Sequence, residues 1–137
     1  MATTARDVIN RSLRILGVLA SGETATASEA DDALVALNSM IDSWQADYAE
    51  WFTASTFSTL NTSQYLPRGY EAAIVYNLCV ELAPEYGVNT SPDIVSRAKE
   101  SFGVLKRRNI TSLRSSTREV ALIGRINDSG TIENGFS

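Results

Sequence analysis

The segment LPRGYEAAIVYNLCVELAPEYG, residues 66–87, decides the fold, because it has a helix's start and stop signals and too much apolar surface for a helix with one face in water. Pro67 stands near the start, where its missing N–H costs nothing, and Pro84 and Gly87 bend and end the element. On a helical wheel the polar side chains occupy about one third of the circumference. They are Glu71, Asn77, Glu81 and Glu85. We therefore expect a central helix of a small bundle, covered by its own subunit alone or partly by a neighbouring subunit.

The composition is that of an ordinary globular protein. The 137 residues are 44% hydrophobic and 20% charged, and one domain of this size buries about two-thirds of its unfolded surface. No apolar run approaches the roughly 20 residues of a membrane span, and the first ten residues, MATTARDVIN, lack the apolar core of a signal peptide. We expect no membrane contact and a cytosolic chain where it is made. The single cysteine, Cys79, excludes an internal disulfide and is expected to be a small buried hydrophobe.

Charge is unevenly distributed along the chain. Residues 1–96 carry 4 basic and 12 acidic side chains, whereas residues 97–125 carry 8 basic and 2 acidic ones. No Lys or Arg occurs between Arg14 and Arg68. A solvated surface explains this polarity, and so does a contact between the basic end of one copy and the acidic flank of the next.

An amphipathic helix is predicted from about Thr4 to Leu19. Its apolar residues follow helical spacing, and Ser21 with Gly22 supplies a stop signal. The stripe consists of Ile9, Leu13, Leu16 and Ala20.

The second predicted helix begins near Ser28 and has the strongest pattern in the sequence. Ser28 and Asp31 resemble a capping box with Asp in place of Glu. Apolar residues then recur alternately every four and three positions, forming a heptad seam of Ala30, Leu34, Leu37, Ile41, Trp44, Tyr48 and Trp51. Because such a repeat packs along a nearly parallel or antiparallel partner, we expect long helices laid side by side.

An extended excursion is predicted after this helix. Residues 52–64, FTASTFSTLNTSQ, are rich in Ser and Thr and show no helical stripe. A short β-hairpin is one alternative for this segment, since Thr and Phe suit strands.

A fourth helix is predicted to begin at Ser91–Asp93, where an N-cap serine precedes a proline at the first helical position. Its stripe is Val95, Ala98, Phe102 and Leu105. We expect it to end near Arg108 or Asn109. Residues 106–108, KRR, either complement the helix dipole in this last turn or serve in binding, and both alternatives stay open.

Beyond Ile110 we predict an extended C-terminal arm over residues 111–137. It either folds back as a strand pair around residues 127–130 or is ordered by a partner. The predicted fold is thus all-α: a compact bundle of about four helices in a domain over residues 1–110, with an extended excursion after the second helix and an extended arm. The positions assigned to the core or to a subunit interface are Leu37, Ile41, Trp44, Tyr48, Tyr70, Ile74, Leu78, Leu82 and Tyr86.

The chain contains no histidine and one cysteine, which limits its chemistry. Ser-His-Asp and Cys-His systems and ordinary zinc sites are excluded, and the segment GVLASG lacks the lysine of a phosphate-binding loop. Paired carboxylates, Glu81 with Glu85 or Asp31 with Asp32, leave glycoside hydrolysis as a minor alternative, because any solvated helix face shows such pairs. We predict no catalytic residue, no cofactor, no metal and no small-molecule substrate.

Two segments carry a resemblance to a known family. RDVINRSLRILGVLASGETATASEADDALVALNSMIDSWQAD, residues 6–47, is followed by YLPRGYEAAIVYNLCVELAPEYG, residues 65–87. The specific parts are LNSMIDSW at residues 37–44 and the LPRGYE start and LAPEYG end of the later segment. In this order and spacing they resemble the phage head-completion adaptor family, the tail accessory factors of short-tailed phages, also called packaged DNA stabilisation proteins.

The resemblance implies a mostly α-helical, structural virion protein. Similar proteins form a ring, typically of twelve copies, beneath the portal vertex, where the ring seals the DNA-filled head and offers a platform for further tail components. The implied partners are the portal protein, copies of the chain itself, downstream tail proteins and passing DNA without sequence-specific binding. The implied location is the portal vertex between head and tail, after the host cytoplasm. By position, the arm would grip the portal through Arg114, Arg118, Val120, Leu122, Ile123, Arg125 and Ile126.

Two other function classes remain as alternatives: a virion-associated peptidoglycan-cleaving enzyme and a cytosolic helical regulatory or interaction protein. An adaptor predicts assembly that depends on the portal. An enzyme predicts one indispensable carboxylate, and a regulator predicts a soluble partner in uninfected cells.

Overall fold

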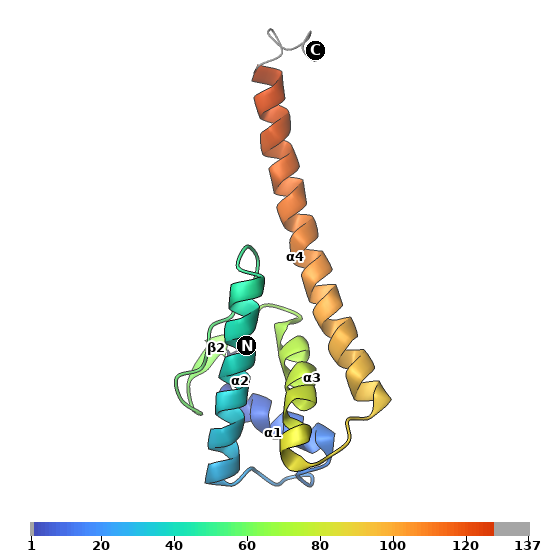
Figure 1. Cartoon of the computed structure of the whole chain (residues 1–137). Coiled ribbons are helices and arrows are strands. Elements are labelled where there is room, and N and C mark those ends of the chain that lie inside the picture. Colours follow the sequence, from blue (N-terminus) through green and yellow to red (C-terminus); the bar gives the residue numbers. More distant parts are fainter. Residues whose placement is uncertain (1, 128–137) are drawn as a thin grey trace. The chain divides into compact units, whose positions relative to one another are not determined.

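The computed structural model describes residues 2–127, and it describes side chains for residues 2–110. Its elements are β1 (Ala2–Thr4), α1 (Ala5–Leu16), α2 (Ala27–Asp47), β2 (Ser63–Tyr65), α3 (Tyr70–Leu82), the 3-10 turn η1 (Pro84–Tyr86) and α4 (Pro92–Asn127). Figure 1 labels β2 and the four α-helices. The chain divides into two compact units, Met1–Leu105 and Lys106–Ser137. Four α-helices with one small sheet confirm the predicted mostly helical fold.

Helix α1 begins and ends on strong local signals. The side-chain oxygen of Thr4 accepts from the Asp7 N–H, and the Asp7 carboxylate accepts from the Thr4 N–H, which makes a capping box. The helix stops at Gly17, whose φ of 85° is left-handed and suits glycine. The predicted end near Leu19 is therefore wrong, and Ala20 lies exposed beyond the helix.

The N-cap of helix α2 is Thr26, two residues before the predicted cap, Ser28. The Thr26 side chain accepts from the Glu29 N–H, and the Glu29 carboxylate accepts from the Thr26 N–H at 2.9 Å. This is the usual capping box, with Thr at the N-cap and Glu three residues later. The predicted box of Ser28 and Asp31 does not form the cap. Because α2 ends at Asp47, the last two seam positions, Tyr48 and Trp51, lie in the cap and the following turn.

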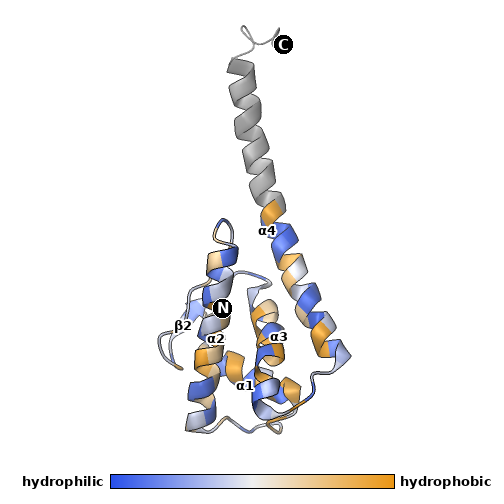
Figure 2. Ribbon diagram, viewed as in Figure 1, coloured by the Kyte–Doolittle hydropathy of each residue, from blue (hydrophilic) through white to orange (hydrophobic). Residues whose placement is uncertain are grey.

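Helix α3 confirms the start and stop signals read from residues 66–87. It begins after Gly69, whose φ is 93°, and Pro84 converts its end into η1 before Gly87 at φ 64°. Six of its side chains, together with Tyr70, are almost wholly buried: Ala73, Ile74, Val75, Leu78, Cys79 and Leu82. In Figure 2 the helix is largely coloured as hydrophobic. The subunit itself therefore covers most of this helix.

The first unit is built around α3. Helices α2 and α3 lie side by side and run antiparallel, and α1 crosses both (Figure 1). This arrangement confirms the expected side-by-side packing of the heptad seam. The contact between α1 and α3 includes Ser12, whose buried hydroxyl donates to the carbonyl oxygens of Val8 and Val75.

The segment after α2 is extended as predicted, but it forms no local hairpin. Strand β2 pairs antiparallel with β1 at the N-terminus, where Ala2 faces Tyr65 and Thr4 faces Ser63. Phe57 is fully buried, and its backbone N–H and C=O both bond to the side-chain amide of Asn38 at 2.8 Å. Isolated apolar residues in this segment thus enter the core instead of forming a stripe.

Helix α4 starts where predicted, because the Ser91 hydroxyl accepts from the Ile94 N–H at 3.3 Å. Ala98 and Leu105 are buried, and the amide of Asn77 donates to the Ala98 carbonyl oxygen at 3.1 Å. The helix then continues to Asn127. The predicted end near Arg108 or Asn109 is wrong, and so is the extended backbone predicted for residues 111–127; residues 128–137 lie outside the described part.

The length of α4 has a reason in its sequence. Positions 98, 102, 105, 109, 113, 116, 120 and 123 follow one another at intervals of three or four, which keeps them on one side of a helix. Most are apolar, but Asn109 and Ser116 interrupt the series, so the sequence shows no continuous apolar stripe here. No proline follows Pro92, so nothing in the backbone forces an earlier stop.

Candidate interaction surfaces

The residues predicted for the core or a subunit interface separate into two groups. Leu37, Ile41, Tyr70, Ile74, Leu78 and Leu82 are buried within the subunit. Trp44, Tyr48 and Tyr86 are half-buried. The second group lies at the ends of α2 and α3, where a side chain contacts its own core and water at once.

Aromatic rings gather at the C-terminal end of α2 and tie it to the first turn of α3 and the third turn of α4. The Trp44 ring lies 5.6 Å from Phe52 and 4.6 Å from Phe102 between ring centroids. The Tyr70 hydroxyl donates to the Trp51 carbonyl oxygen and accepts from the Thr53 N–H, both at 3.2 Å. These contacts fix the turn after α2 and hold the neighbouring surface of α2 in one place.

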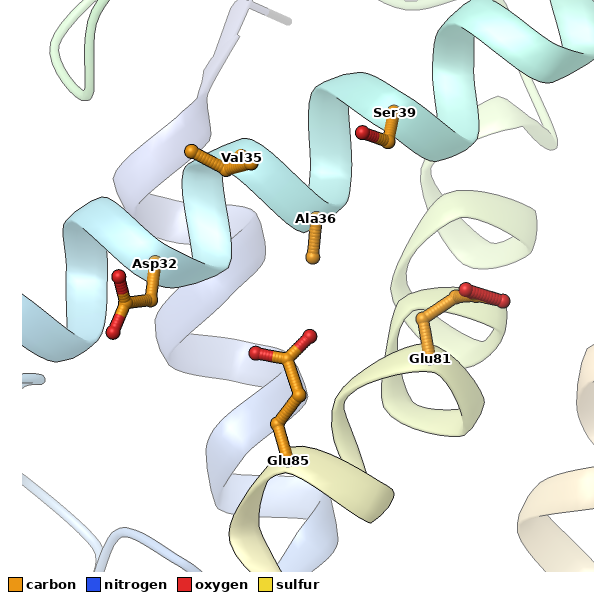
Figure 3. A pocket seen from close by; sticks show the side chains of 6 residues that line it. All are labelled: Asp32, Val35, Ala36, Ser39, Glu81 and Glu85. Atoms are coloured by element: carbon orange, nitrogen blue, oxygen red, sulfur yellow. The ribbon is translucent and has the colours of Figure 1, made fainter.

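A shallow groove of about 420 Å³ lies between α2 and the end of α3 with η1 (Figure 3). Helix α2 contributes Asp32, Val35, Ala36 and Ser39, which share one side of the helix, and Glu81 and Glu85 line the opposite wall, with the Glu85 carboxylate pointing toward α2. We call this the Val35 groove. The Val35 side chain is 68% exposed, whereas the side chains on the opposite side of α2 are buried in the core. The groove therefore combines an apolar floor with three carboxylates.

The Val35 groove lies in a region of negative charge. Helix α2 contains no Lys or Arg, and in residues 2–110 the one ion pair joins Arg11 to Glu71, outside the groove. Burial raises the pKa of the nearby Tyr86 hydroxyl, and the charges of Glu29, Glu85 and Asp32 raise it further. A negative potential that extends to Tyr86 makes the groove attractive to a cation.

The basic residues lie mainly on α4. Arg107 and Arg108 are exposed, and they follow the exposed Val104 by three and four positions. Arg107, Arg114, Arg118 and Arg125 are separated by seven, four and seven positions, intervals that return to the same side of a helix. The backbone of all seven residues predicted to bind a portal lies in α4, while their side chains lie outside the described part.

Comparison with known families accounts for nearly the whole chain. Residues 1–133 match the family described as P22 tail accessory factor. The chain belongs to this family. The resemblance carried by residues 37–44 and 66–87 is thereby confirmed. A comparison with individually curated proteins gave no match.

Membership in the tail accessory factor family supports a structural role in a phage tail, association with the virion and contacts with other virion components. Within the described residues, no helix is both long enough and apolar enough to cross a membrane. In the same part of the chain, no group of three or more His, Cys, Asp or Glu side chains is arranged to hold a metal ion.

The candidate chemical groups of this tail accessory factor have ordinary environments. Glu81 and Glu85 are exposed, as are Asp31 and Asp32, so none has the apolar enclosure that makes a carboxyl group a general acid. Burial raises the pKa of the Cys79 thiol to about 11, which favours the unreactive protonated form. This agrees with the structural role that the family indicates.

The sequence of this tail accessory factor indicates the carboxylates but not the groove that they line. Glu81 and Glu85 were paired with each other because one helical turn separates them. Asp32 and Val35 come from α2, and nothing in the spacing of the two segments shows that they meet. The exposed Val35, off the heptad seam of α2, was the one local signal available.

Proposed function

We propose that this tail accessory factor is a head-to-tail adaptor. Several copies, twelve by the family resemblance, would form a ring beneath the portal vertex, close the DNA-filled head and provide a platform for further tail proteins. The observation that carries the proposal is the separation of charge: residues 1–96 hold 12 acidic side chains against 4 basic ones, and residues 97–125 hold 8 basic against 2 acidic. Opposite charges on two segments of one chain favour head-to-tail contacts between copies, and such contacts can close into rings.

The acidic surface also suits a position around exiting DNA. Helix α2 carries only negative charges, and a channel lined by carboxylates repels phosphates and leaves DNA free to slide. The adaptor is accordingly expected to show no sequence-specific DNA binding. Before assembly the subunits would accumulate in the host cytoplasm.

Portal attachment is assigned to the C-terminal part of α4. Arginines and apolar residues alternate there, at Arg114, Arg118, Val120, Leu122, Ile123, Arg125 and Ile126. Their backbone is helical, so the attachment segment would dock as a helix with one basic side. Charged side chains at the edge of an interface increase the rate of association and make binding sensitive to salt.

The test uses two truncations and portal rings from the same phage. A chain ending at Ile110 is expected to lose binding in a sedimentation assay, whereas a chain ending at Asn127 keeps it, because it retains all seven predicted contact residues. Electron microscopy of the mixtures checks whether bound subunits form a ring. Normal decoration of the portal by the chain ending at Ile110 would place attachment in the first unit and contradict this assignment.

A further inference from the structure

Two exposed valines stand out on the surface of residues 2–110. The exposed large hydrophobic side chains in this part are Val35, at 68%, Val104, at 37%, and Tyr65, at 71%. A single exposed apolar side chain is ordinary, but these two valines lie in surroundings of opposite charge. That difference makes Val35 and Val104 complementary rather than merely exposed.

The surroundings of Val35 are acidic and concave. Asp32, Glu81 and Glu85 line the groove around it, and Figure 3 shows Glu85 reaching toward α2. No basic side chain in residues 2–110 forms an ion pair with any of the three. The groove thus has an apolar floor that contacts water and negative charges that lack a nearby counterion from the described part of the chain.

Basic side chains outnumber acidic ones around Val104 on α4, where Arg107 and Arg108 follow it by one turn and the exposed Glu100 precedes it by one turn. On helix α4 the side chains three and four positions later are neighbours on the helix surface, and they are Arg107 and Arg108. Both arginines are exposed. We call Val104 with Arg107 and Arg108 the Val104 turn. Long arginine side chains can lay their stems on an apolar floor while their guanidinium groups reach carboxylates.

We propose that the Val104 turn of one copy docks in the Val35 groove of the next. The valines bury each other, and Arg107 and Arg108 meet the carboxylates of Asp32, Glu81 and Glu85. The contact uses two different surfaces of the subunit, so it is heterologous and repeats from copy to copy until a ring closes. This inference rests on the proposed ring, and it names the lateral contact within it.

A second copy fits the groove better than a nucleic acid does. Phosphates would be repelled by the three carboxylates, whereas the Val104 turn supplies both the positive charge and the apolar surface that the groove lacks. The contact also leaves Arg114, Arg118 and Arg125 available for the portal, because it uses only the part of α4 before Asn109.

Cross-linking between two single-cysteine variants tests the contact. One chain carries Val35→Cys and the other Val104→Cys, both in a Cys79→Ala background, and they are mixed at high concentration with a short bismaleimide. A cross-linked heterodimer is expected from the mixture, and neither variant alone should give comparable product. The matched control replaces Val35→Cys by Ala46→Cys, an exposed position on the same helix outside the groove, and should give no product. Circular dichroism confirms that each variant is folded.

A second experiment exchanges the charges across the proposed contact. Glu85→Arg in the Val35→Cys chain, or Arg108→Glu in the Val104→Cys chain, should remove the cross-linked dimer, and the two together should restore it. Cross-linking in the mixture with Ala46→Cys as strong as with Val35→Cys, or no rescue by the double exchange, would overturn the proposal.

The same reaction on portal rings separates this inference from the proposed function. If subunits decorate the portal without a 35–104 cross-link, the ring uses another lateral contact. This result contradicts the proposed contact but not the adaptor function. A 35–104 cross-link in solution together with no portal binding supports the contact and counts against the adaptor function.

Discussion

The thiol of Cys79 in α3 donates a hydrogen bond to the backbone carbonyl oxygen of Ser12 in α1, 3.4 Å away, and both side chains are fully buried. The Ser12 hydroxyl in turn donates to the Val75 carbonyl oxygen at 3.1 Å. Two small side chains at one crossing let the helices approach closely, and each satisfies a polar group there. The contact fixes α1 against the helix on which the rest of the first unit is built.

Replacing Ser12 tests how closely the two helices pack. Ser12→Ala should lower the free energy of unfolding by about 1 kcal/mol, because it removes one hydroxyl and its hydrogen bonds. Ser12→Leu adds a larger side chain at a crossing without free space, and overpacking costs about 1–3 kcal/mol more. Urea denaturation of both variants gives the comparison. Equal stability of the two variants would show that the crossing has room for a leucine.

The buried thiol should be protected from reagents. With a folded-state pKa of about 11, Cys79 is protonated at neutral pH, so a thiol-exchange reagent should react slowly with the native protein and rapidly in urea.

The raised pKa of Cys79 also makes the free energy of unfolding depend on pH. In the unfolded chain the thiol has its ordinary pKa of 9.0, so the stability that Cys79 contributes is complete below this pH and is lost as pH rises toward the folded-state pKa of about 11. Denaturation at several alkaline pH values, with Cys79→Ala as the control, measures the difference; rapid native labelling at pH 7 would contradict the burial.

The seam of α2 offers a graded prediction for core substitutions. Ile41 is fully buried, and Ile41→Ala should cost about 2–5 kcal/mol of unfolding free energy, as buried isoleucines do. Trp44 is half-buried against Phe52 and Phe102, so Trp44→Ala should cost about 2 kcal/mol, below the roughly 3–5 kcal/mol of a tryptophan in a closed core. Chemical denaturation of the two variants tests the order. A larger loss for Trp44→Ala than for Ile41→Ala would place the tryptophan deeper than the structure does.

The sequence predicted best where a signal is local. Pro84, Gly87 and Ser91 each act within a few residues, and the corresponding helix ends lie where they were predicted. Thr26 and Glu29 carried an equally local signal, but Ser28 and Asp31 offered a competing cap two residues later. The structure has the cap at Thr26, where the Glu29 carboxylate accepts from the cap N–H at 2.9 Å, shorter than the 3.4 Å between the Asp7 carboxylate and the Thr4 N–H in α1.

Contacts between distant segments could not be predicted from spacing. The pairing of Ala2 with Tyr65 depends on how the bundle brings the N-terminus beside the excursion, and neither strand has more than three residues. The Val35 groove likewise exists only because α2 lies against the end of α3. In both cases the tertiary arrangement, not the local sequence, supplies the partner.

The length of α4 gives the last prediction, because the structure and the sequence disagree about residues 111–127. The helix has 36 residues, and the last 17 follow Ile110. A chain ending at Ile110 should therefore lose about one fifth of its far-ultraviolet helical signal, since the α-helices of the protein have 12, 21, 13 and 36 residues. Its melting temperature should stay close to that of the full chain, because the buried core lies in the first unit, up to Leu105. A chain ending at Asn127 is the control and should keep the helical signal of α4. An unchanged helical signal after truncation at Ile110 would support the extended arm predicted from the sequence. A large fall in melting temperature would show that residues 111–137 stabilise the core of the first unit.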